Sequence, residues 1–96
     1  GPAIYAFVVE QLTVSAQRLG FTAADARTMA EQTFVGTAQL MVATGDESAE
    51  LRRKVTSPKG TTERIVAVLD DADLASIFDR AAAAAITRAE ELSAGS

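Results

Sequence analysis

This 96-residue sequence has neither cysteine nor histidine. The lack of cysteine excludes a disulfide framework and a thiol nucleophile. The lack of histidine removes the commonest general base and the commonest metal ligand. There is also no G-x-G-x-x-G dinucleotide fingerprint, no P-loop, and no apolar run near the ~18 residues of a membrane span. By itself, the chain is therefore not expected to catalyse a redox or hydrolytic reaction, to bind a metal or to cross a membrane.

Positive charge is scarce as well. The sequence has nine lysines and arginines and thirteen acidic residues, which gives a net charge of −4. A nucleic-acid binder usually gathers basic residues on one face. The nearest such group, Arg52–Lys54, precedes a predicted helix end, where cations are favourable in any case. We therefore expect no nucleic-acid partner. The apolar first residues lack a basic leader, so no signal peptide is seen, and a cytoplasmic location fits these absences.

The supply of large apolar side chains is small for a monomer core. Hydrophobic residues make up 48% of the sequence, but many are alanines, which add helix propensity and little buried area. The first predicted helix is apolar on most sides, with Tyr5, Val8 and Leu12 on one stripe and Ile4 and Phe7 beside it. A helix of this kind is buried on most sides. We therefore predict that the chain dimerises.

The hydrophobic periodicity is helical throughout, without β alternation between turn signals. It predicts a single all-α domain of about five helices, two of them long and antiparallel and the others shorter. Thr22 and Asp73 are expected N-caps, and Gly20 and Gly45 are expected to end helices. The predicted ranges are 2–19, 23–44 (or 43), 47 (or 48)–54, 62–70 and 74–92, with a frayed tail at 93–96.

The turn between the third and fourth predicted helices is the one credible ligand site. Pro58 fixes its own φ, Gly60 adopts angles closed to other residues, and Thr61 or Thr62 is expected to cap the next helix. Free N–H groups at the positive end of a helix suit a carboxylate. Ser57 and Thr62 add hydroxyls, and Gly60, Thr61 and Thr62 are expected to offer N–H groups. The same residue types also form ordinary helix connections, and both interpretations stay open here.

Several segments, taken in order, resemble one known family. Residues 55–62, V-T-S-P-K-G-T-T, are similar to the signature V-[TS]-S-P-G-G-T-T of the pyrroline-5-carboxylate reductase family. Residues 1–7 resemble the start of its helical domain, 31–38 its long-helix segment and 88–92 its closing R-[SA]-x-E-L. The likeness covers essentially all 96 residues. Lys59 departs from the signature, because it replaces the first glycine. A lysine would be strained if this position has a positive φ.

The resemblance implies a dimerisation and substrate domain with a fold like the C-terminal domain of 6-phosphogluconate dehydrogenase, in an interlocked homodimer. It further implies that Ser57, Gly60, Thr61 and Thr62 hold the carboxylate of Δ1-pyrroline-5-carboxylate in the last step of proline biosynthesis. NADPH or NADH would bind an N-terminal Rossmann domain that is absent from residues 1–96, so this chain would be a fragment, bind no cofactor and be inactive. The alternative is a purely structural helical dimerisation module without ligand binding.

Overall fold

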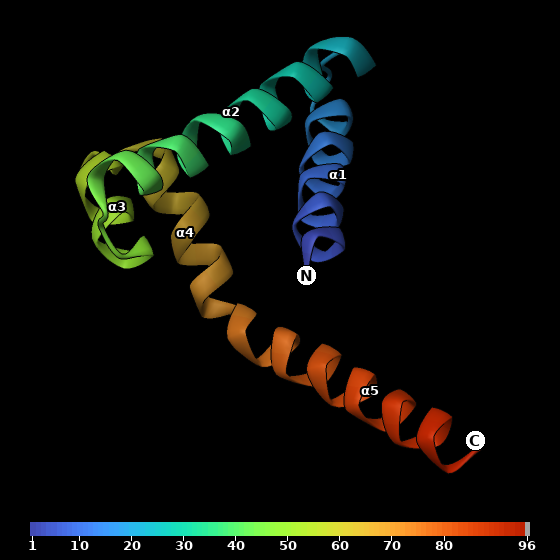
Figure 1. The fold of residues 1–96 in the computed structure, drawn as a ribbon. Coiled ribbons are helices and arrows are strands. Elements are labelled where there is room, and N and C mark those ends of the chain that lie inside the picture. Colours follow the sequence, from blue (N-terminus) through green and yellow to red (C-terminus); the bar gives the residue numbers. More distant parts are fainter. Residues whose placement is uncertain (96) are drawn as a thin grey trace. The chain divides into compact units, whose positions relative to one another are not determined.

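Five helices make up the computed structural model, which describes residues 1–95 (Figure 1). No strand occurs among those residues. The predicted all-α class is therefore confirmed, and the predicted helix bounds differ from the observed ones by at most two residues. The helices are α1 (Pro2–Arg18), α2 (Ala23–Thr44), α3 (Ser48–Val55), α4 (Thr61–Asp71) and α5 (Leu74–Ala94).

The chain divides into two compact units, residues 1–53 and the residues from Lys54 onward. In the first unit α1 and α2 form a helical hairpin, with α2 packed against α1 (Figure 1). The hairpin loop follows from local chemistry. Gly20 has a φ of 109°, which favours glycine, and the Thr22 side chain accepts a hydrogen bond of 3.1 Å from the Asp25 N–H. The predicted cap at Thr22 is thereby confirmed.

Gly45 ends α2 as predicted. Its φ of 68° is left-handed, and its N–H donates to the carbonyl of Met41 at 3.0 Å. This geometry satisfies one of the carbonyls that a helix end leaves without an intrahelical partner. The short helix α3 follows three residues later.

The second unit contains α4 and α5, which meet near Ala72 and Asp73. Asp73 is the N-cap of α5, as predicted, with a φ of 54° and its carboxylate accepting from the Ser76 hydroxyl. The predicted cap of α4 at Thr61 or Thr62 is wrong, because Gly60 holds that position without a side-chain cap. The predicted frayed tail is also partly wrong. Ser93 and Ala94 belong to α5, and Ser96 lies outside the described residues.

Little of either unit is buried. Among residues 1–95, only Ala26 and Leu51 are buried, and the four phenylalanines are 44–58% exposed. Apolar side chains of this size are usually found inside a folded protein, so their exposure on several helices marks surfaces that a partner would cover. None of the helices in this part of the chain combines the length and apolarity needed to span a bilayer.

Candidate functional site

A tight turn in the second unit connects α3 to α4. The Gly60 N–H donates to the carbonyl of Ser57 at 3.1 Å, which closes a four-residue β-turn. Pro58 occupies the second position, and Lys59, with a φ of 61°, occupies the third. A proline followed by a residue of positive φ is the pattern of a type II turn. The structure therefore explains why a glycine would suit position 59, and it shows lysine in the strained conformation.

Gly60 suits its position for a different reason. Its φ of −82° and ψ of 175° are extended and open to any residue. However, a Cβ built on Gly60 would lie 3.1 Å from the Ser57 carbonyl oxygen. The turn therefore favours glycine at this position because of limited space and not because of backbone freedom.

Two of the three expected main-chain donors remain available at this turn. The Gly60 N–H is used by Ser57, so the expectation that it is offered to a ligand does not hold in this geometry. Thr61 and Thr62 open α4, where N–H groups have no intrahelical acceptor. No acceptor for either N–H is found within residues 1–95. Both threonines and Ser57 are exposed, so the turn presents two amides and nearby hydroxyls at the positive end of α4.

Glu63 belongs to this site and was missed from the sequence. Its carboxylate accepts a hydrogen bond from the Lys59 N–H. Glu63 stands three residues after the N-cap Gly60, where glutamate commonly reaches back to an N–H before the helix. That spacing was the signal available in the sequence. The acidic side chain places a negative charge at the same helix end that would receive a carboxylate ligand.

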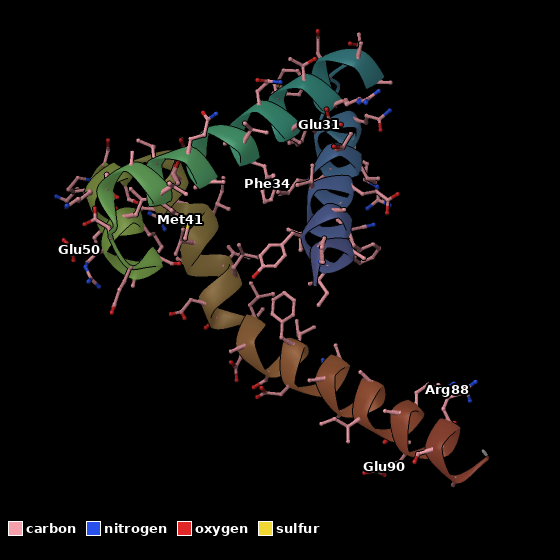
Figure 2. The ribbon with its side chains drawn as sticks, viewed as in Figure 1. Glu31, Phe34, Met41, Glu50, Arg88 and Glu90 are labelled. Atoms are coloured by element: carbon pink, nitrogen blue, oxygen red, sulfur yellow. The ribbon has the colours of Figure 1, made fainter. Side chains whose placement is uncertain are left out.

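A second feature, in the first unit, is a groove between α1 and α2, which we call the α1–α2 groove. Its volume is about 570 Å³, and its lining residues are Ala6, Val9, Glu10, Thr13, Val14, Gln17, Ala23, Arg27, Glu31 and Phe34. Half of these lining residues are apolar, and one of them, Phe34, projects into the groove from α2 (Figure 2). Sequence reasoning missed the groove, because it arises only where two helices meet.

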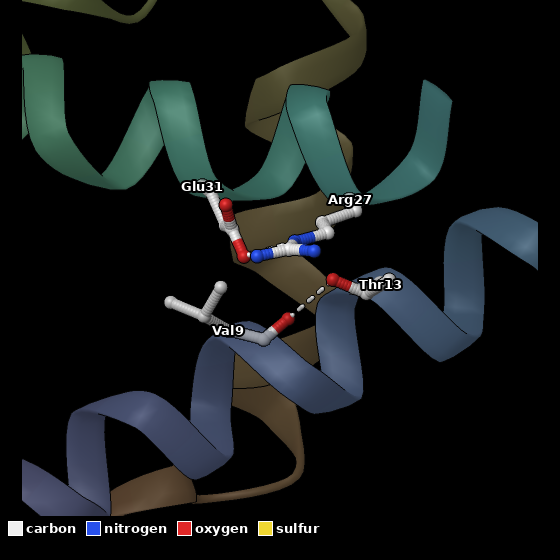
Figure 3. A network of polar contacts seen from close by, with 4 residues as sticks. All are labelled: Val9, Thr13, Arg27 and Glu31. Atoms are coloured by element: carbon white, nitrogen blue, oxygen red, sulfur yellow. Dashed lines mark hydrogen bonds and ion pairs between the residues drawn. The ribbon is translucent and has the colours of Figure 1, made fainter. Parts of the chain in front are cut away.

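Polar side chains cross one part of this groove (Figure 3). Arg27 and Glu31 project from α2 toward α1 and form an ion pair of 2.8 Å, while the Thr13 hydroxyl donates to the carbonyl of Val9 at 2.9 Å. The hydrogen bond to Glu31, together with its charge, raises the pKa of the Arg27 guanidinium above its ordinary value. Because the pair is exposed, it contributes little to stability. No cluster of metal-ligating side chains occurs in the described part of the chain.

Comparison with known proteins places the chain in a family. The family model described as pyrroline-5-carboxylate reductase dimerisation matches residues 1–92. The sequence is 40% identical to a pyrroline-5-carboxylate reductase of Corynebacterium melassecola, over 95% of this chain and 34% of the relative. It is also 40% identical to one of Synechocystis sp., over 96% of this chain and 34% of the relative.

A solved structure supports the same family assignment. A pyrroline-5-carboxylate reductase from Coxiella burnetii matches with a TM-score of 0.86 and 40% identity, over 96% of this chain and 34% of that chain. These matches place the chain in the class of helical dimerisation domains that pyrroline-5-carboxylate reductases contain. The chain belongs to the pyrroline-5-carboxylate reductase dimerisation family, which confirms the resemblance drawn from the sequence. It spans about a third of the length of the curated relatives it matches.

Proposed function

We propose that this chain is the C-terminal dimerisation and substrate-carboxylate-binding domain of a pyrroline-5-carboxylate reductase, the NAD(P)H-dependent enzyme of the last step of proline biosynthesis. The observation that carries this proposal is the family match over residues 1–92, which includes the whole turn before α4. The domain would be residues 1–96 of this chain, following a Rossmann domain in the complete enzyme.

The substrate carboxylate would bind at Ser57, Gly60, Thr61 and Thr62. The exposed N–H groups of Thr61 and Thr62 and the positive end of α4 support this assignment. Gly60 contributes by closing the turn, and Ser57 by offering its hydroxyl. A carboxylate held on fixed main-chain donors has a fixed orientation, which would bring the imine carbon of Δ1-pyrroline-5-carboxylate to a constant position relative to the hydride donor. Thr62 would lie near the ring nitrogen.

NADPH or NADH would be held by residues outside this chain, because residues 1–96 contain no dinucleotide fingerprint. When bound, the nicotinamide supplies the hydride. The isolated chain is then expected to neither bind nor oxidise NADPH. Oxidation of NADPH with pyrroline carboxylate by the pure chain would contradict this part of the proposal.

Two copies would associate through the helical surfaces. The exposed phenylalanines of α1, α2 and α5 support a homodimer, because association would remove them from water. Sedimentation of the pure chain is the direct measurement. A stable monomer at micromolar concentration would contradict the homodimer.

The carboxylate site is tested by NMR titration of the chain with L-proline, the product of the proposed reaction. We expect amide shifts confined to the turn, at Ser57, Thr61 and Thr62. Pyrrolidine is the matched control ligand, because it has the same ring without the carboxylate and should leave these amides unmoved. If proline moves none of them, or pyrrolidine moves them equally, the chain is a structural dimerisation module without a carboxylate site.

A further inference from the structure

Lys59 has an unusual backbone conformation for its residue type. Only two non-glycine residues among residues 1–95 have a positive φ, Lys59 at 61° and Asp73 at 54°. Aspartate tolerates this region, and the Asp73 carboxylate also accepts a hydrogen bond from the Ser76 hydroxyl. A lysine side chain has no acceptor for such a local bond. Strained residues cluster at functional sites, so the Lys59 side chain is a candidate for a role beyond holding the turn.

The side chain of Lys59 is exposed, and its ammonium is unpaired. It forms no ion pair and no side-chain hydrogen bond within residues 1–95. Glu63 is the acidic residue nearest to it in the sequence, but the Glu63 carboxylate accepts from the main-chain N–H of Lys59 instead. The ammonium is therefore available to a ligand.

Positive charge is concentrated around this turn. Five of the nine lysines and arginines fall between residues 52 and 64, but only one of the thirteen acidic residues does. A local excess of one sign of charge attracts ligands of the opposite sign. This segment therefore favours anions, although the chain as a whole has a net charge of −4.

Lys59 is close enough to share a ligand with the free amides of α4. Gly60 alone separates Lys59 from Thr61. Since consecutive Cα atoms are about 3.8 Å apart, the Cα atoms of Lys59 and Thr61 are no more than about 7.6 Å apart. A lysine ammonium stands at the end of a flexible four-carbon stem. It can therefore reach an anion that is bound at the N–H groups of Thr61 and Thr62.

We propose that the Lys59 ammonium is a further carboxylate-binding group of this site, and that it makes the site select ligands with a net negative charge over zwitterions. This inference rests on the proposed carboxylate site and adds a charged group that the family signature lacks at this position. It also gives the strained lysine a function, because a glycine at position 59 would relax the turn but supply no charge.

Such a selection distinguishes the substrate of the proposed reaction from its product. The imine nitrogen of pyrroline carboxylate is less basic than the amine nitrogen of L-proline. At neutral pH the substrate is therefore largely an anion, whereas the product is a zwitterion. A cation at the site attracts the carboxylate of both molecules but repels the ring ammonium of proline. Lys59 thus favours binding of the substrate and release of the product.

An NMR titration with two matched ligands tests this selection. Tetrahydrofuran-2-carboxylate has the ring size and the carboxylate of L-proline, but an oxygen replaces the ring ammonium. Both ligands are titrated into the unaltered chain and into Lys59→Gln, which keeps a long side chain without the charge. We expect Lys59→Gln to weaken binding of tetrahydrofuran-2-carboxylate about three- to tenfold. Binding of L-proline should weaken less, so that the preference for the anion falls about two- to threefold.

Two further variants serve as controls for charge. Lys59→Arg keeps the cation and should keep the preference for the anion. Arg80→Gln removes a cation of α5, outside the turn, and should leave both affinities unchanged. In the unaltered chain, the ε-methylene resonance of Lys59 should shift when tetrahydrofuran-2-carboxylate binds, and added salt should reduce the preference, because it screens exposed charges.

The outcomes separate this inference from the proposed function. If neither ligand moves the amides of Ser57, Thr61 and Thr62 in the unaltered chain, the carboxylate site and the role of Lys59 are overturned together. If both ligands bind but Lys59→Gln binds them as tightly as the unaltered chain, or Arg80→Gln loses as much, only the role of Lys59 is overturned. An equal loss for both ligands overturns the charge selection.

Discussion

Replacing Thr61 by proline would remove one of the two N–H groups proposed to bind the substrate carboxylate and leave the fold in place. Thr61 is the first residue of α4, where proline is well tolerated because its fixed φ suits the helix. The preceding Gly60 has a φ of −82° and a ψ of 175°, the extended conformation that a residue before proline prefers. No hydrogen bond within residues 1–95 uses the Thr61 N–H. The free energy of unfolding should therefore change little.

The Thr61→Pro substitution should weaken carboxylate binding strongly. A hydrogen bond to a charged group is worth about 1.5–3 kcal/mol. Since about 1.4 kcal/mol corresponds to a factor of ten, the dissociation constant for L-proline should rise roughly 10- to 100-fold. The turn is exposed to water, which favours the lower end of this range.

The measurement is an NMR titration of each variant, with urea unfolding to confirm its stability. Thr61→Ala is the first control, because it removes the hydroxyl and keeps the N–H. Ala23→Pro is the second. It makes the same backbone change at the first residue of α2, after Thr22 in a similar extended conformation. Equal proline affinities for Thr61→Pro and Thr61→Ala would refute the role of this N–H.

Three further variants test the turn. Lys59→Gly should stabilise the fold by up to about 1 kcal/mol in urea unfolding, because it relieves the positive φ. Asp73→Gly should gain less, because aspartate tolerates that region, and an equal gain would argue against this account. Gly60→Ala should destabilise by roughly 1 kcal/mol, since its Cβ would press on the Ser57 carbonyl, and unchanged stability would show that the turn adapts. Glu63→Gln keeps an acceptor for the Lys59 N–H and removes the competing charge, so proline should bind about two- to fivefold more tightly, whereas weaker binding would contradict the electrostatic argument.

Helix positions were predictable from the sequence because their signals are local. Thr22 caps α2 through a neighbour three residues away, and Gly45 ends the same helix through its own backbone angles. The place of the candidate site was also predictable, since Pro58 and Gly60 interrupt the helical pattern wherever the rest of the chain lies. Family resemblance over the same residues then pointed to a carboxylate.

The use of individual donors was not predictable. Thr61 and Thr62 are both good capping residues, yet the turn closes through the Gly60 N–H and makes Gly60 the cap. Which threonine amides stay free depends on where that hydrogen bond forms. The positive φ of Lys59 follows from the same closure, because a type II turn demands it at the third position whatever residue stands there.

By itself, the sequence determined the helices, their ends and the turn chemistry, because these depend on residues within a few positions of one another. Only the tertiary structure decided where α1 and α2 open the groove that Phe34 lines and how Arg27 and Glu31 come to project from α2 toward α1. Such features depend on atoms that folding brings together from separate segments, and no local pattern of residues encodes their distances.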